Sequence, residues 1–475
     1  MPILKPFNGM QITKADATWN LIATTLRVAS GIIVLPLVLY FLPQEDLALW
    51  TIFLSFGAMV ILLDFGFAQT FSRNITYIFS GARALKSKGY TDIDELREPD
   101  YALLKGVIRS MRFFYGVISV FFLMGLLTAG SYYIWKVLET YRGDKQAVIT
   151  AWALFAVIVA AQLYTLLYDV LMQGRGMIRR NKQILALAQL VQIGVTAGSL
   201  VAGCGIIAMV YGQLAALVVN RILAHLAFYD KQLRESLRVK SSTSIRDILN
   251  ITAPNAARVG ITALGGFLAS RAGIFITSLY LPLSDIASYG ITQQVIDILV
   301  SISVVWLTTF YPRITQFRVT GDPQGVKRLY LKSRIFYIAV YAAGAAFLLL
   351  WGNDILLLIH SKTLFLPVAV FAVGLAALYI ETRYTLAAYM LLSKNEVPYY
   401  KASLLAGLVN VVLLFIFVVY LQMGILSIFV ARGISMLYNG IKWPHDVKRE
   451  LRITFSDYKK TTANFGCELL KRPTQ

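Results

Sequence analysis

Residues 402–421 have the sequence ASLLAGLVNVVLLFIFVVYL, which contains no charged side chain. About 20 residues of α-helix extend about 30 Å, the thickness of the hydrocarbon core of a lipid bilayer. Similar runs recur along the 475-residue chain, in which 57% of the residues are hydrophobic and 15% are charged. The mean hydropathy is +0.64, and a soluble protein needs more charge to cover its surface. The sequence therefore predicts an all-α integral membrane protein.

The apolar runs predict about twelve transmembrane helices, arranged as two lobes of six. The first run is too long for the apolar part of a signal peptide and lacks a cleavage site of small residues, so we expect a retained span. The expected spans are 18–42, 46–72, 106–134, 147–173, 183–203, 206–228, 257–281, 285–311, 330–350, 365–392, 402–421 and 424–441.

The loops between these spans alternate in charge. The outer loops hold only four of the 45 Lys and Arg residues, namely Lys136, Arg142, Lys145 and Lys362. Because Lys and Arg concentrate on the cytoplasmic side of membrane proteins, we expect both ends of the chain in the cytoplasm. The same rule accounts for the net charge of +20. No basic domain stands out, so nucleic acid is not an expected partner.

A polar stretch in mid-chain separates the two sets of six spans. We expect an N-terminal lobe at 1–228, a cytoplasmic linker at 229–256, a C-terminal lobe at 257–441 and a basic cytoplasmic tail at 442–475. Two lobes of similar layout are a common plan of alternating-access transporters, in which the substrate site lies between the repeats.

The sequence offers little support for catalysis. The outer loops have at most about 14 residues and the longest cytoplasmic loop about 33, too few for a soluble catalytic domain. Phosphate-loop and dinucleotide fingerprints are absent. The two cysteines and three histidines are scattered and form no recognised metal motif. We therefore expect neither an enzyme nor a bound cofactor, while coupling to H⁺ or Na⁺ stays open.

Several charged residues lie deep inside predicted spans, where each costs on the order of 2.5–3.5 kcal/mol on insertion scales. The arginines among them are candidates for lining a substrate cavity: Arg27, Arg271, Arg383 and Arg432. The carboxylates are candidates for neutralising those arginines or for carrying a coupling proton: Asp297, Glu381 and Asp64. Asp64, near the inner end of its span, has a structural cap as its alternative.

Arg271 gives the clearest geometric argument. On one helix Thr262, Gly266, Ala269 and Gly273 lie within about 60° of one another. They predict a packing face of small residues. Arg271 lies about 170° from the centre of that face, at mid-depth, so it faces lipid or an aqueous cavity. We predict the cavity, with an internal ion pair as the alternative. Guanidinium groups bind phosphate oxygens bidentately, so such a cavity suits an anionic substrate.

The segment Leu63-Asp64-Phe65-Gly66-Phe67, followed by Arg73, resembles a pattern of the polysaccharide and O-antigen flippases. These form a branch of the multidrug/oligosaccharidyl-lipid/polysaccharide (MOP) exporter superfamily. Other local patterns are also similar: Gln173-Gly174-Arg175-Gly176 to Asn181, and Tyr289-Gly290 with Pro312. The resemblance covers essentially the whole chain, with twelve spans in two six-helix lobes.

The resemblance implies a substrate, namely an undecaprenyl-diphosphate-linked oligosaccharide such as an O-antigen repeat unit. It would be moved from the cytoplasmic to the periplasmic leaflet of the bacterial inner membrane. The expected partners are this lipid-linked glycan, membrane lipids and other polysaccharide-assembly proteins. Two alternatives stay open: an ion-coupled multidrug exporter of the same superfamily, whose cavity should hold more carboxylates, and a membrane-embedded glycan polymerase or ligase.

Overall fold

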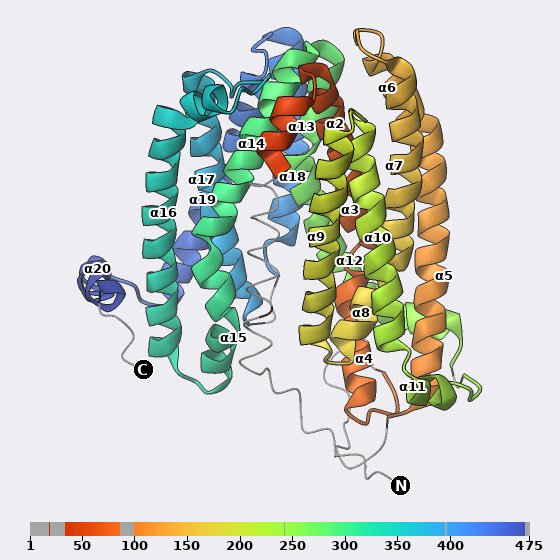
Figure 1. Cartoon of the computed structure of the whole chain (residues 1–475). Helices are drawn as coiled ribbons and strands as arrows, with labels where there is room; N and C mark the ends of the chain where they lie inside the picture. Colours follow the sequence, from red (N-terminus) through yellow and green to blue (C-terminus); the bar gives the residue numbers. More distant parts are fainter. Residues whose placement is uncertain (1–18, 20–33, 86–98, 242, 395–396, 471–475) are drawn as a thin grey trace. The chain divides into compact units, whose positions relative to one another are not determined.

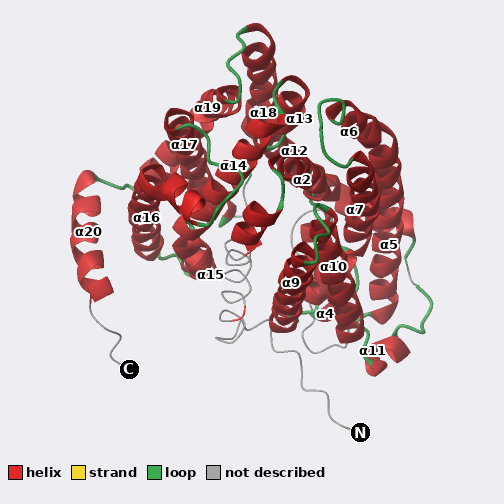
Figure 2. Cartoon of the chain, turned by 45° about the horizontal axis from the view of Figure 1, so that its top comes forward, coloured by secondary structure: helices red, strands yellow, loops and turns green. Residues whose placement is uncertain are grey.

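The computed structural model describes residues 19, 34–85, 99–241, 243–394 and 397–470 (Figure 1). Every regular element in these residues is a helix, and Figure 2 shows no strand among them. The chain divides into two compact units, Met1–Ala263 (unit 1) and Leu264–Gln475 (unit 2).

Unit 1 contains residues 34–41, which are helical and end the first predicted span. The remaining helices of unit 1 follow in chain order: α2 (Gln44–Gly57), α3 (Met59–Asp64), α4 (Phe67–Phe79), α5 (Tyr101–Gly125), η1 (Leu126–Gly130), α6 (Ser131–Val137), α7 (Lys145–Thr165), α8 (Leu167–Gly174), α9 (Ile178–Val201), α10 (Ile207–Phe228) and α11 (Lys231–Ser236). The pairs α9–α10, α5–α7 and α4–α8 pack side by side.

The second predicted span is broken rather than continuous. Phe65 and Gly66, between α3 and α4, have φ angles of 49° and 77° in the left-handed region. A Cβ atom on Gly66 would lie 2.5 Å from the Cβ of Val259, also in unit 1, so only glycine fits both the backbone conformation and the contact. The break therefore depends on one residue without a side chain.

Unit 2 begins within α12 (Ile245–Ser270), a helix that runs through the boundary between the units. Part of the stretch expected to be a linker is thus helical, in α11 and the first turns of α12. The other helices of unit 2 are α13 (Ala272–Tyr280), α14 (Leu283–Ser303), α15 (Val305–Val319), α16 (Pro323–Leu358), α17 (Val368–Leu392), α18 (Tyr400–Phe415), η2 (Ile416–Tyr420), α19 (Leu426–Glu450) and α20 (Phe455–Leu470).

Nine helical segments of the described residues are long and apolar enough to cross a membrane, or ten if the bent pair α14–α15 forms one span. The bend in that pair is 47°. Most of the first predicted span lies outside the described residues. The helix at the twelfth predicted span, α19, is not among these nine segments. Polar residues such as Asn439 and Lys442 lower its hydropathy. The prediction of an all-α membrane protein is confirmed.

The predicted packing face of small residues is partly wrong. Ala269 is buried and a Cβ on Gly273 would touch Ile428, but a Cβ on Gly266 would meet no described atom within 4 Å. Gly265 makes the close contact instead, because its backbone oxygen would lie 2.6 Å from a Cβ on Gly407 of α18. The packing face is centred nearer Gly265 and Ala269 than predicted, and Gly266 lies about 100° round the helix from Gly265.

Candidate functional site

The charged residues predicted inside unit 2 converge on one buried centre. Arg432 of α19 is 5% exposed. Its Nε donates to Oε2 of Glu381 at 2.6 Å, and its Nη2 donates to Oε1 at 3.1 Å. This contact is possible because α17, which carries Glu381, packs side by side with α19. A paired, two-point contact of this kind is the strongest geometry for a guanidinium and a carboxylate.

Gln293 of α14 extends the contact to a second carboxylate. Its Oε1 accepts a hydrogen bond from Nη1 of Arg432 at 3.3 Å, and its Nε2 donates to Oδ1 of Asp297 at 2.7 Å. Gln293 and Asp297 are four residues apart, so they lie one helical turn from each other on the same face of α14. The side-chain amide of Gln293 therefore connects Arg432 to Asp297 through two hydrogen bonds.

The last member of this series of contacts is Arg271, whose Nη2 lies 3.7 Å from Oδ2 of Asp297. Arg271 stands at the junction of α12 and α13, with φ of −119°, within the helical segment Val259–Tyr280 that is long and apolar enough to cross a membrane. The two side chains are 38% and 45% exposed, in contrast to Arg432. At 3.7 Å the pair is an ion pair without a hydrogen bond. We call these five residues the unit 2 network: Arg271, Gln293, Asp297, Glu381 and Arg432.

The formal charges of the unit 2 network cancel, because two guanidinium groups face two carboxylates. Arg432 is enclosed by its partners, because its Nε and Nη2 donate to Glu381 and its Nη1 donates to Gln293. Arg271 differs, since its side chain donates no hydrogen bond to any described residue. Of the two arginines, only Arg271 keeps its donors available to a bound molecule.

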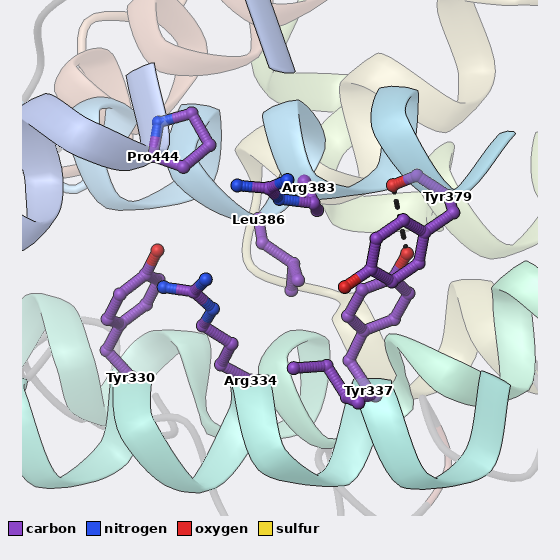
Figure 3. A pocket seen from close by; sticks show the side chains of 8 residues that line it. Tyr330, Arg334, Tyr337, Tyr379, Arg383, Leu386 and Pro444 are labelled. Carbon is purple, nitrogen blue, oxygen red and sulfur yellow. Dashed lines mark hydrogen bonds between the residues drawn. The ribbon is translucent and has the colours of Figure 1, made fainter. Parts of the chain in front are cut away.

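Arg383 does not join the network, although it follows Glu381 by only two residues. Residues two apart on a helix point to different faces. The guanidinium of Arg383 lies 6.0 Å from the ring centre of Tyr379, in a pocket that also contains Arg334 of α16 (Figure 3). Its Nε is buried and has no hydrogen-bond partner among the described residues.

Asp64 belongs to unit 1 and is the last residue of α3, directly before the break between α3 and α4. Its carboxylate accepts hydrogen bonds from the hydroxyl of Tyr115 at 2.7 Å and from the backbone N–H of Ala68 at 3.0 Å. The second contact occupies a free N–H at the start of α4, as a helix cap does. In this structure Asp64 has the position of a cap and a loop anchor.

Arg27, the remaining candidate, lies outside the described residues. Three partners were not expected from the sequence: Gln293, Tyr115 and Arg334. Gln293 had a local signal, since it precedes Asp297 by one helical turn. Tyr115 is 51 residues from Asp64, and nothing in the local sequence points to that contact.

No group of three or more His, Cys, Asp or Glu side chains that would suit a metal ion occurs in the part of the chain that the structure describes. No protein-family model and no curated protein matches this sequence.

Solved structures of transporters, however, share the fold. An inward-facing multidrug resistance MATE family transporter of the MOP superfamily is 15% identical, with a TM-score of 0.65, over 94% of this chain and all of that chain. The outward-facing structure of such a transporter is 15% identical, with a TM-score of 0.56 over 96% and 100%. A MATE structure in the straight conformation is 13% identical, with a TM-score of 0.56 over the same shares. This chain therefore shares its all-helical fold with MATE transporters of the MOP superfamily, and nine or ten helical segments of its described residues could cross a membrane.

Proposed function

We propose that this protein is a MOP-superfamily transporter that flips an undecaprenyl-diphosphate-linked oligosaccharide across the bacterial inner membrane by alternating access. The fold supports transport, because its relatives include inward-facing and outward-facing transporters. The substrate class is inferred from the exposure of Arg271 and from its lack of hydrogen bonds to described residues. Its guanidinium is 38% exposed in mid-span and donates no hydrogen bond to a described residue.

A phosphate group is the natural ligand of such an arginine. Guanidinium keeps its charge at every physiological pH and offers a planar fork of donors to phosphate oxygens. A sugar diphosphate cannot enter hydrocarbon without large desolvation, whereas its polyprenyl tail can stay in the lipid. Asp297, 3.7 Å away, orients Arg271 without occupying its donors. We infer that Arg271 contacts the diphosphate.

An ion-coupled multidrug exporter is the second candidate. The observation that favours it is the fold, since the solved structures with this fold include a multidrug resistance transporter. The composition of the unit 2 network weighs against a cationic drug, because its two carboxylates are already matched by two arginines. The chemistry of Arg271 thus favours an anion. H⁺ or Na⁺ coupling fits either function.

The test is leaflet-resolved detection of the lipid-linked repeat in a deletion strain. Loss of a flippase leaves the repeat fully assembled but confined to the cytoplasmic leaflet, and surface polysaccharide disappears. Loss of a drug exporter leaves the surface glycan unchanged and raises sensitivity to lipophilic cations. Loss of a polymerase still allows single repeats to reach the periplasm. A normally exposed repeat in the deletion strain, with no second transporter able to substitute, would overturn the proposal.

A further inference from the structure

A second pair of arginines in unit 2 faces a pocket of its own. Arg334 of α16 and Arg383 of α17 line a small pocket of about 10 Å³ that is partly open to its surroundings. Figure 3 shows both guanidinium groups in this pocket, with Tyr330 and Tyr337 on the same helix as Arg334. The freely accessible part has room for about one water-sized group. The pocket therefore suits a small polar group rather than a whole sugar.

The two arginines have no counter-charge among the residues that the structure describes. No carboxylate lines the pocket, and neither Arg334 nor Arg383 forms an ion pair with a described residue. The Nε of Arg383 is buried and has no hydrogen-bond partner in the described part of the chain. A buried donor on a charged group destabilises the protein when it has no hydrogen-bond partner. The pocket thus has an electrostatic and a hydrogen-bonding deficit that an anion would remove.

Aromatic rings shape the pocket. Tyr330 is 1% exposed and Tyr337 is fully buried. The hydroxyl of Tyr337 donates to the backbone oxygen of Tyr379 at 3.0 Å, which fixes that wall (Figure 3). The ring of Tyr379 then lies 6.0 Å from the guanidinium of Arg383. None of the residues that line the pocket is a carboxylate.

The C-terminal helix α20 covers the Arg334 side. Figure 1 looks along the axis of α20 while α16 stands upright, so the two helices cross at a steep angle. Tyr458 of α20 accepts a hydrogen bond from Nη1 of Arg334, and its ring lies 5.2 Å from that guanidinium. Arg334 lies 11 residues after the start of α16, about 17 Å along the helix. This end of α16 also carries Lys327, Arg328 and Lys332, and we expect it on the cytoplasmic side.

We propose that Arg334 and Arg383 bind an oxygen of a phosphate group at this pocket, with Tyr458 as its cover. The phosphate comes from the headgroup of a membrane lipid or from free inorganic phosphate. Both sources present the same oxyanion, and two guanidinium forks match its oxygens. The site shares no residue with the unit 2 network and does not depend on the flippase proposal.

The experiment uses the full chain in detergent and measures its thermal unfolding midpoint during titration. One arm adds inorganic phosphate, and a second adds dihexanoyl phosphatidic acid, with dihexanoyl phosphatidylcholine as the lipid control. Arg334→Gln and Arg383→Gln are the test variants. Arg328→Gln is the matched control, because Arg328 is an exposed arginine on the same helix outside the pocket. General salt effects act equally on all four proteins.

We expect a saturable rise of the midpoint in the wild type and in Arg328→Gln. Either test variant should weaken the apparent affinity about ten- to hundredfold, the loss of one charge-assisted contact. A rise with phosphatidic acid alone identifies a lipid headgroup, whereas an equal rise with inorganic phosphate identifies the free anion. Equal titrations in all four proteins, or no rise with either probe, would overturn the site. If a Gln variant fails to accumulate, Arg334→Lys and Arg383→Lys replace it, and unweakened binding in both would refute the proposal.

Discussion

Arg432 of α19 donates two hydrogen bonds, of 2.6 and 3.1 Å, to the carboxylate of Glu381 on α17. Arg432→Gln should lower the free energy of unfolding by about 3–5 kcal/mol, because it strands a carboxylate in the interior. The double variant Glu381→Gln/Arg432→Gln removes both charges and should recover much of that loss. Thermal unfolding of both proteins in one detergent checks this. A double variant as unstable as the single would show that the ion pair is not the cause.

Arg271→Ala should abolish transport while the protein accumulates nearly normally in the membrane. The reason is that Asp297, its partner, is 45% exposed and is not stranded by the change. Arg271→Lys should recover only part of the activity, because an ammonium group cannot make the forked phosphate contact. Flipping of the lipid-linked repeat and protein level are measured together. Normal flipping by the alanine variant would remove Arg271 from the substrate path, and a failure to accumulate would indicate an internal structural pair.

Gly66→Ala should be more destabilising than Gly203→Ala. Both glycines have left-handed φ angles, 77° and 80°, so each substitution costs about 1–2 kcal/mol of backbone strain. Only at Gly66 would the new Cβ meet another atom, 2.5 Å from Val259, whereas Gly203 has nothing within 4 Å among the described residues. Such overpacking adds about 1–3 kcal/mol. Thermal unfolding compares the pair, and equal losses would contradict the close contact.

The predicted orientation places Cys204 near the outer face and Cys467 in the cytoplasm. Cys204 is partly exposed in the turn between α9 and α10, and Cys467 falls within α20. In intact cells an impermeant thiol reagent should label a variant that keeps only Cys204. A variant that keeps only Cys467 should be labelled after lysis alone. Labelling of Cys467 from outside would reverse the topology.

The ion pair of Lys327 with Asp457, at 2.8 Å, fastens the start of α20 to α16. The Lys327 ammonium group and the N–H of Thr454 hold the pKa of Asp457 below its ordinary value of 3.8. A depressed carboxyl pKa stabilises the docked state above pH 3.8, and the effect is lost only as pH falls through the lower, folded value. Docking should therefore be unchanged between pH 7 and pH 5.

Trypsin cleavage after the exposed Lys459 and Lys460 reports this docking, because cleavage requires local opening of α20. Asp457→Asn should be cleaved faster than the wild type at every pH tested. Asp446→Asn, on α19, is the control for loss of a carboxylate. A wild-type tail that opens between pH 7 and pH 5 would refute the assigned role of Asp457.

Hydropathy located most spans within a few residues. The expected 206–228 corresponds to α10 (Ile207–Phe228), and 147–173 corresponds to α7 and α8, which cover 145–174 with one break. Such agreement is possible because the apolar length needed to cross lipid is a local property of the chain. The breaks at Arg271 and Val304 were missed, since neither position carries the Pro or Gly that usually marks a kink.

The contacts of the site depend on tertiary structure, so they are harder to predict from the sequence than the spans. Glu381 and Arg432 were both recognised as costly intramembrane charges, but their pairing joins residues 51 apart and follows from how α17 meets α19. Arg383 was also recognised as an intramembrane charge, but it does not join the unit 2 network. It lies two residues after Glu381 and therefore points to a different face of the helix. A charge inside a span indicates that a partner or cavity exists without identifying it.

The cancelling charges of the unit 2 network have an electrical consequence. A group with no net charge does no net work when it moves through the membrane potential, whatever distance the conformational change carries it. A phosphate does, at about 2.3 kcal/mol for each elementary charge and each 100 mV. In a cell whose interior is negative, the electrostatic force on an anion points outward, away from the cytoplasmic leaflet. If the proposed substrate is correct, the membrane potential acts on the cargo rather than on the network, and it favours export.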